Sequence, residues 1–134
     1  MTRFVIVPQV ALALAETEAV ITDGHRLLAP TLLRSQVLAD LYDQVRSGRL
    51  SRQEAGRRLD YLRGLRLRLL GDRVLQRVAW DLAEALDWPD TLVAEYLALT
   101  KLQGDALVTD SAELAEAASR FVTVVPMSEL LPRH

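Results

Sequence analysis

The first apolar stretch of the chain is Phe4-Val-Ile-Val7, which stops at Pro8. A short apolar run without polar interruption is typical of a strand that is buried on both faces. It therefore predicts a central strand of a parallel sheet. The alanine- and leucine-rich residues 9–19 predict a helix behind this strand, and residues 23–25 predict a loop.

A pair of helices is predicted in the next part of the chain. Apolar residues recur at steps of three and four from Leu33 to Val45, which indicates a helix with one apolar stripe that Gly48 ends. Ser51 and Glu54 have the spacing of a capping box, so a second helix begins there and continues to Gly64. Because the connection is short, we expect the two helices to form a hairpin.

The residues after this hairpin predict an edge strand and two helices. The run Leu65-Arg-Leu-Arg-Leu69 alternates strictly, which is typical of a strand with one buried face at the edge of a sheet. Asp72 has the position of a helix cap, and the break Trp88-Pro-Asp90 separates its helix from another one over residues 91–102.

The end of the chain completes an alternation of strands and helices. Apolar residues 106–109 and 121–125 predict two more strands, with a short helix over residues 111–119 between them. Strands that alternate with helices, without a tight turn between strands, predict right-handed crossovers. We therefore expect an α/β fold in one domain, 1–134, with a central parallel sheet of four to five strands and helices on both faces.

Composition narrows the class of protein. A chain of 134 residues that is 50% hydrophobic and 25% charged is typical of one globular domain. The sequence has no cysteine, which excludes thiol catalysis and cysteine-based zinc sites. The apolar run before Pro8 is too short for a signal peptide or a membrane span, so we expect a cytoplasmic protein without a membrane partner. Fifteen arginines against one lysine favour a high-GC, bacterial source.

Charge is distributed unevenly. Residues 46–77 contain ten arginines and three acids, a net charge of +7, whereas the rest of the chain has a net charge of −9. One interpretation is that these arginines cover the solvent faces of two helices and one strand. The other is a surface for RNA or phosphate, because the guanidinium group donates two parallel hydrogen bonds to phosphate oxygens. The candidate contacts are Arg46, Arg49, Arg52, Arg66 and Arg68.

The sequence lacks the common motifs for nucleotide binding and for serine catalysis. No glycine-rich phosphate loop follows the first strand, and no serine stands in a nucleophile elbow. His25 is expected in a loop and His134 stands at the terminus, so neither histidine is expected to be catalytic. The remaining candidate chemistry is a divalent metal held by carboxylates, since Mg²⁺ and Mn²⁺ prefer oxygen ligands.

Three segments carry a resemblance to a known family. Leu28-Ala-Pro-Thr-Leu-Leu-Arg-Ser-Gln-Val-Leu38, Leu69-Leu-Gly-Asp-Arg-Val-Leu75 and Ala94-Glu-Tyr-Leu-Ala-Leu-Thr100, followed by Ala106-Leu-Val-Thr-Asp110, resemble segments of PIN-domain proteins of the VapC toxin type. The resemblance implies a three-layer α/β/α domain, often a homodimer. It also implies an endoribonuclease that uses Mg²⁺ or Mn²⁺ held by four acids and that is neutralised by an antitoxin.

The four acidic positions of that family are not acidic in this sequence. They fall on Val7, Gln36, Val93 and Ser111, so the resemblance implies no catalytic residue and no metal cofactor here. Val7 and Val93 are then expected in the core. We expect the side chains of the four positions to converge at the carboxyl ends of the strands.

Two nearby acids provide an alternative. Asp40 lies one helical turn beyond Gln36, and Asp110 is adjacent to Ser111. Asp40 is otherwise expected to be a solvated residue on its helix. Asp110, with Glu113 three residues later, has the spacing of a helix cap and its reciprocal partner.

These observations support one leading hypothesis and two alternatives. The leading hypothesis is a catalytically degenerate VapC-like protein that binds an antitoxin, a second copy of itself, or RNA. The first alternative is an active Mg²⁺-dependent endoribonuclease whose displaced ligands are Asp40 and Asp110. The second is an unrelated α/β interaction domain. Apolar side chains spread around the predicted hairpin favour a homodimer or an antitoxin complex there, namely Leu32, Leu41, Tyr42, Tyr61 and Leu62.

Overall fold

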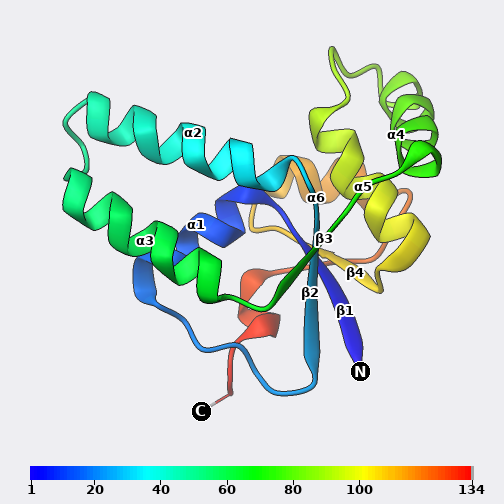
Figure 1. The fold of residues 1–134 in the computed structure, drawn as a ribbon. Coiled ribbons are helices and arrows are strands. Elements are labelled where there is room, and N and C mark those ends of the chain that lie inside the picture. Colours follow the sequence, from blue (N-terminus) through cyan, green and yellow to red (C-terminus); the bar gives the residue numbers. More distant parts are fainter. Residues whose placement is uncertain (134) are drawn as a thin grey trace.

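A five-stranded parallel sheet forms the middle layer of the molecule, which we describe over residues 1–133 of a computed structural model. Helices cover both faces of this sheet (Figure 1). The sheet has the strand order β3-β2-β1-β4-β5. All neighbouring strands are parallel, and their bounds are β1 Thr2–Ile6, β2 His25–Pro30, β3 Leu67–Leu70, β4 Ala106–Val108 and β5 Val124–Val125.

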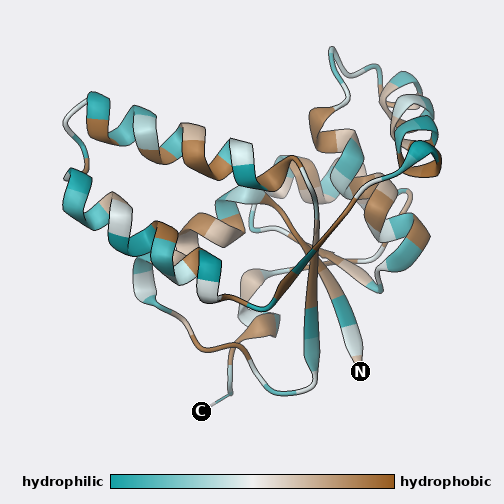
Figure 2. Cartoon of the chain, in the orientation of Figure 1, coloured by the Kyte–Doolittle hydropathy of each residue, from teal (hydrophilic) through white to brown (hydrophobic). Residues whose placement is uncertain are grey.

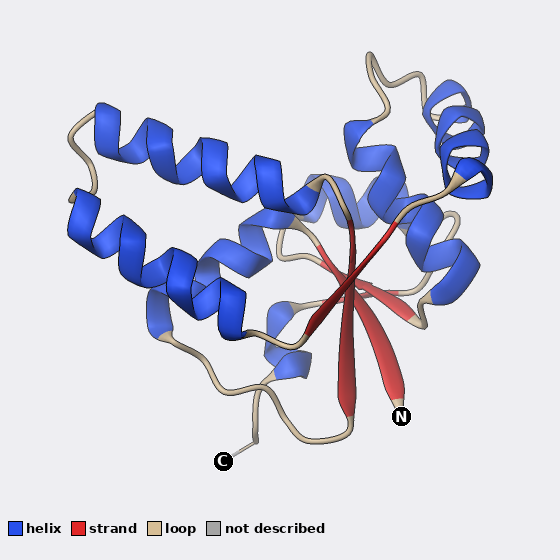
Figure 3. Ribbon diagram, viewed as in Figure 1, coloured by secondary structure: helices blue, strands red, loops and turns tan. Residues whose placement is uncertain are grey.

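The helices form the two outer layers (Figure 3). One layer contains α1, α2 and α3, which pack against one another, and α5 lies on the other side of the sheet against β1, β2 and β4, with α4 packed on it. The bounds are α1 Pro8–Thr17, α2 Leu33–Arg46, α3 Arg52–Gly64, α4 Arg73–Ala85, α5 Leu92–Gln103 and α6 Ala112–Ala118, followed by the short helix η1 Met127–Leu130. The predicted α/β fold with helices on both faces is confirmed.

The first strand has the central position that its apolar run predicted. β1 pairs with β2 on one side and with β4 on the other, and Phe4 to Val7 are all buried. Pro8 begins α1, where its fixed φ angle suits the first turn and its missing N–H removes no helical hydrogen bond. The strand thus feeds directly into a helix at its carboxyl end.

The helix caps predicted at Ser51 and Asp72 are also found. The Ser51 hydroxyl accepts a hydrogen bond from the main-chain N–H of Glu54, and the Asp72 carboxylate accepts one from that of Leu75. Each bond satisfies a donor that the first turn of a helix leaves free. The predicted hairpin is α2–α3, and the alternating strand β3 lies at the sheet edge, as expected.

Two predictions about strands need correction. His25 is not in a loop but begins β2, whose apolar centre of three residues is too short to indicate a strand alone. β2 exists because it lies between β1 and β3, which supply hydrogen-bond partners on both sides. The predicted last strand shortens to Val124–Val125, since the N–H groups of Phe121 and Val122 donate to the Ala118 carbonyl and prolong the turn after α6.

Within residues 1–133, no helix is long and apolar enough to cross a membrane.

Candidate functional site

A groove lies where the carboxyl end of the sheet meets the first turns of two helices. Ile6 is paired with Val108, so the residues that follow β1 and β4 leave the sheet side by side. Here the chain turns into α1 and α6, and α5 begins nearby with Val93 on the wall. We call this cavity of about 700 Å³ the carboxyl-end groove. Open parallel sheets commonly bind their ligands at this end.

The groove has an apolar wall. Its apolar lining comes from α1, the loop before α5, the first turn of α5, and α6, namely Val10, Ala13, Trp88, Pro89, Val93, Leu114 and Ala117. Val93 is 40% exposed, so the prediction that it is a core residue is wrong. The periodicity of α5 could not show this, because the side of the helix facing the groove is also apolar.

Of the other positions that the resemblance matched to acids, Ser111 lines this groove, whereas Val7 and Gln36 do not. Ser111 lines it and caps α6, because its hydroxyl accepts a hydrogen bond from the N–H of Leu114 at 3.2 Å. Val7 is only 2% exposed and lies in the core, as predicted, directly before α1. Of the four positions, Val93 and Ser111 therefore share one cavity wall.

Gln36 is connected to α5 by a hydrogen bond. The Tyr96 hydroxyl, one helical turn beyond Val93, donates to the Gln36 side-chain oxygen at 2.5 Å. Burial raises the pKa of Tyr96, and the nearby charge of Glu95 raises it further. The phenol therefore stays protonated and keeps its role as donor. Burial also raises the pKa of Glu95. A Gln36 amide that accepts this bond ties α2 to α5.

The two acids of the alternative hypothesis are not together. Asp110 lines the groove, but its carboxylate accepts a hydrogen bond from the N–H of Met127 at 2.9 Å, so Ser111 and not Asp110 caps α6. Asp40 is exposed on α2 and accepts a hydrogen bond from Gln44, as a solvated helix residue does. Asp40 does not line the groove.

Two further carboxylates line the groove wall, and the sequence pattern gave neither of them a place in a site. Asp90 and Glu113 lie there with Asp110. Asp90 accepts a hydrogen bond from the N–H of Leu92 at 3.0 Å, which is a local turn contact. Within the described residues 1–133, no three histidine, cysteine or acidic side chains are grouped closely enough to hold a metal ion. The groove thus combines an apolar wall with separate negative charges.

The predicted basic block divides into two groups. Arg46, Arg49 and Arg52 lie at the tip of the α2–α3 hairpin, where Arg49 pairs with Asp43 at 3.0 Å. Arg66 and Arg68 belong to the sheet instead, directly before and within β3. The structure therefore does not bring the five arginines onto one surface.

A cluster of partly buried ion pairs on α3 also connects this helix to Glu18 at the end of α1. Arg57 and Arg58 both donate to Glu54, and Arg57 also pairs with Glu18 at 2.7 Å. The hydrogen bonds from Arg57, and then those from Arg58, lower the pKa of Glu54 to about 2. These two arginines are already neutralised within the chain.

Comparisons with known proteins bear on the fold. No family model matches the sequence. No curated protein matches it significantly. Among solved structures, PAE2754 from Pyrobaculum aerophilum is similar at a TM-score of 0.76 and 20% identity, over 96% of this chain and 91% of that chain. A structure of VapBC2 from Rickettsia felis bound to a DNA fragment from its promoter is similar at a TM-score of 0.67 and 8% identity. The similarity covers 92% of this chain and 98% of that chain. These similarities concern the fold, which is PIN-like as predicted.

Proposed function

We propose that this PIN-like chain acts by binding another polypeptide in the carboxyl-end groove, without a catalytic metal. The observation that carries the proposal is Val93: it lines the groove with a partly exposed apolar side chain, at the position where the resemblance places an acid. A metal ligand set needs carboxylate oxygens at such a position. An exposed apolar wall favours a ligand with apolar side chains.

The groove also indicates the chemistry of the partner. Its apolar wall suits leucine-like side chains, and Asp90, Asp110 and Glu113 suit basic ones. A segment that carries both on one face would fit, as an amphipathic helix docks in a groove. The resemblance to VapC-type proteins and the similarity to VapBC2 support a cognate antitoxin as the source of this segment.

A peptide titration tests the groove. The probe is a synthetic amphipathic helix of leucine, alanine and arginine, and the control peptide has glutamate in place of arginine. We expect only the basic peptide to bind, as measured by calorimetry. Val93→Lys should weaken binding at least about tenfold, because it replaces an apolar contact by a repelling charge.

Leu92→Lys is the matched control variant. Leu92 precedes Val93 on the same helix and is similarly exposed, at 45%, but it does not line the groove. Its variant should bind the basic peptide as the parent does. Equal loss in both variants, or binding of the acidic peptide alone, would contradict the proposed site.

The competing function is a metal-dependent endoribonuclease that uses Asp40 and Asp110. Two separated carboxylates do not complete a metal site of the kind such a reaction needs. We expect no cleavage of single-stranded RNA with Mn²⁺ or Mg²⁺, and no tight binding of Mn²⁺ by calorimetry. Cleavage that EDTA and Asp110→Ala both abolish would establish the enzyme instead.

We also propose that two copies of the chain pair through α2. Leu38 and Tyr42 are one helical turn apart and are 55% and 65% exposed, which is unusual for side chains of this size on a helix. Light scattering should give a dimer mass that Tyr42→Lys converts to a monomer mass. A monomer mass for the parent at high micromolar concentration would exclude this pairing.

We also propose that the protein is cytoplasmic, which cell fractionation tests.

A further inference from the structure

We propose that Arg3, Arg26, Arg66 and Arg68 form a binding site for the phosphate backbone of a nucleic acid. These residues, which we call the four-arginine face, line a cavity of about 790 Å³ at the amino-terminal end of β1, β2 and β3. The site lies at the opposite end of the strands from the carboxyl-end groove. It does not depend on the proposed peptide-binding function.

The parallel register places three of the four side chains, those of Arg3, Arg26 and Arg68, on one face of the sheet. Arg3 is paired with Arg26 across β1 and β2, and Leu28 is paired with Arg68 across β2 and β3. Since side chains alternate along a strand, Arg26 and Leu28 point to the same face. Arg3 and Arg26 are therefore side by side on β1 and β2, and Arg68 lies on the same face of β3. Arg66 directly precedes β3 and lines the same cavity.

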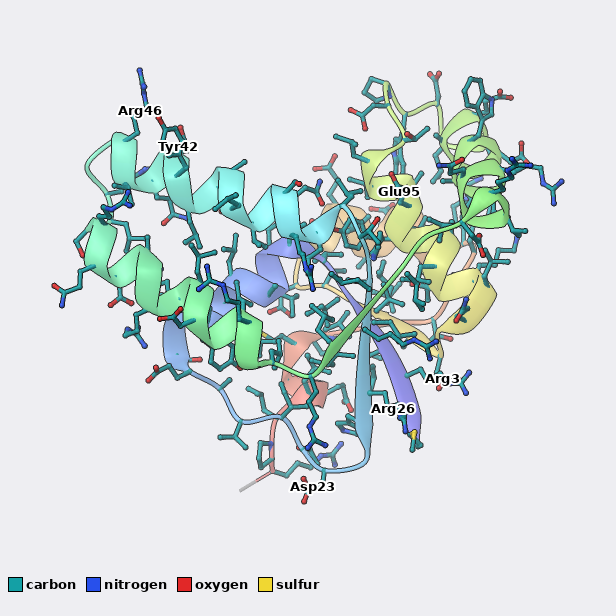
Figure 4. The ribbon with its side chains drawn as sticks, viewed as in Figure 1. Arg3, Asp23, Arg26, Tyr42, Arg46 and Glu95 are labelled. Atoms are coloured by element: carbon teal, nitrogen blue, oxygen red, sulfur yellow. The ribbon has the colours of Figure 1, made fainter. Side chains whose placement is uncertain are left out.

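This part of the sheet is left open by the helix that covers the same face. α5 packs against β1 and β2 and ends at Gln103, which lines the cavity. Beyond that point the four arginines are exposed. Figure 2 shows polar residues at the ends of β1 and β2 nearest the N-terminus. Figure 4 shows Arg3 and Arg26 close to these ends, far from Arg46 at the tip of the hairpin.

The charges of this face are not balanced within the described chain. Over residues 1–133, none of the four guanidinium groups forms an ion pair, in contrast to Arg49, Arg57, Arg58 and Arg63 on the hairpin. Asp105 is bound to the main-chain N–H of Arg3 at 2.8 Å, so it holds the strand end. Neighbouring strands are about 4.8 Å apart, and like charges directly across them repel each other.

A phosphate backbone fits this arrangement better than an acidic protein. Each guanidinium can donate two parallel hydrogen bonds to phosphate oxygens, and a row of phosphates relieves the repulsion along the row of arginines. A protein interface needs apolar anchors at its centre. Of the large exposed apolar side chains in residues 1–133, only Met1 lines this cavity.

The site should bind without strong sequence preference. Among the described residues, His25 is the only one with an aromatic ring that lines the cavity, and it is half-buried and packs edge-on against Phe4, so it is not a platform for bases. Contacts to phosphates position a nucleic acid but do not distinguish its bases. We therefore expect similar affinities for oligonucleotides of different sequence, and the comparison of single-stranded RNA with duplex DNA identifies the preferred backbone.

Fluorescence anisotropy with labelled single-stranded RNA and duplex DNA tests the inference on the full chain. With four phosphate contacts, log K for single-stranded RNA should fall against log salt with a slope of about −3. Arg26→Gln with Arg68→Gln should reduce the slope to about half and weaken binding about tenfold at low salt. Arg26→Lys with Arg68→Lys should keep the slope and lose part of the affinity, because lysine donates as a point charge.

The matched control is the hairpin tip. Arg46→Gln with Arg52→Gln removes the same charge from exposed arginines outside the cavity and should leave both affinity and slope unchanged. Circular dichroism confirms that each variant is folded. Three results would overturn the inference: no binding of either nucleic acid, equal weakening by the tip variant, or tighter binding of poly-glutamate than of RNA. None of them affects the peptide titration of the groove, so failure of one proposal is distinguishable from failure of the other.

Discussion

The two ends of the sheet carry opposite chemistry. At the carboxyl end, helix starts and loops form a groove with an apolar wall and separate acids. At the amino end, three strand residues and Arg66, which directly precedes β3, line one cavity with four arginines. The same strands thus support two surfaces that attract different ligands, and a substitution at one end should leave the ligand of the other end unaffected.

The physical origin of the two surfaces also differs. At the carboxyl end, β1 and β4 turn directly into helices, so residues from separate segments meet there. At the amino end, alternation along the strands places polar side chains over part of the sheet that α5 does not cover. The turns from strands into helices thus form the carboxyl-end groove, whereas the alignment of neighbouring strands forms the four-arginine face.

The largest expected effect separates the buried and exposed parts of the carboxyl end. Val7→Asp should lower the free energy of unfolding by about 3 to 5 kcal/mol, because it places an unpaired carboxylate in the core. Val93→Asp should change it by less than about 0.5 kcal/mol, since that side chain already meets solvent. Urea denaturation of both variants measures the difference. Equal losses would show that Val93 belongs to the core after all.

Acids at all four matched positions should turn the carboxyl end of the sheet into a site that binds a divalent metal ion. The variant with Val7→Asp, Gln36→Glu, Val93→Asp and Ser111→Asp should be less stable than the parent without metal, because the carboxylates repel one another. Mg²⁺ at about 100 times its dissociation constant should return roughly 2.7 kcal/mol. If the melting temperature of this variant does not respond to Mg²⁺ or Mn²⁺, the residue matching is wrong.

The next effect tests the packing under the amino end. A Cβ atom at Gly104 would lie 2.9 Å from a methyl carbon of buried Val5 and 3.1 Å from the Thr100 backbone. Gly104→Ala should therefore cost about 1 to 3 kcal/mol of stability. Gly56→Ala is the control, because nothing lies within 4 Å of its Cβ position in helix α3. It should stabilise the protein by about 0.5 to 1 kcal/mol, and a reversed order would contradict the close packing around Gly104.

A smaller effect concerns repulsion within the four-arginine face. Arg26→Gln should raise the free energy of unfolding by about 0.2 to 1 kcal/mol at low salt, since it removes a like charge between its neighbours. The gain should disappear near 1 M salt, where screening is nearly complete. Thermal melts at both salt concentrations measure it. Arg46→Gln, at the hairpin tip, should show no such gain.

The smallest effect appears in acid and concerns the arginines that are already paired. Hydrogen bonds from Arg57 and then Arg58 hold the pKa of Glu54 at about 2, below its usual value of 4.5. A lowered pKa means that the carboxylate stabilises the fold above pH 4.5, and that this contribution is lost as the pH falls towards about 2. Glu54→Gln should therefore be less stable at pH 7 and lose less on acidification. The melting temperatures of parent and variant, measured at several pH values from 7 to 2, test this. An equal fall of both melting temperatures with pH would refute it.

Local signals in the sequence predicted much of the fold because they depend on neighbouring residues. The apolar run from Phe4 to Val7, and the caps at Ser51 and Asp72, each report a contact within a few positions. The strand β2 carries a weak local signal, since Arg26 and Pro30 flank only three apolar residues. Its strand state follows from the two neighbours that hydrogen-bond to it.

The sequence alone determined the alternation of strands and helices, the helical hairpin, and which positions lack the acids that the resemblance implies. Only the tertiary structure decided that Val93 lines a groove and that Arg3 and Arg26 join Arg66 and Arg68. A helical or strand period specifies which residues share a face, but not what covers that face. The cover depends on strand order and on where α5 ends, and both arise from packing between segments that are distant in sequence.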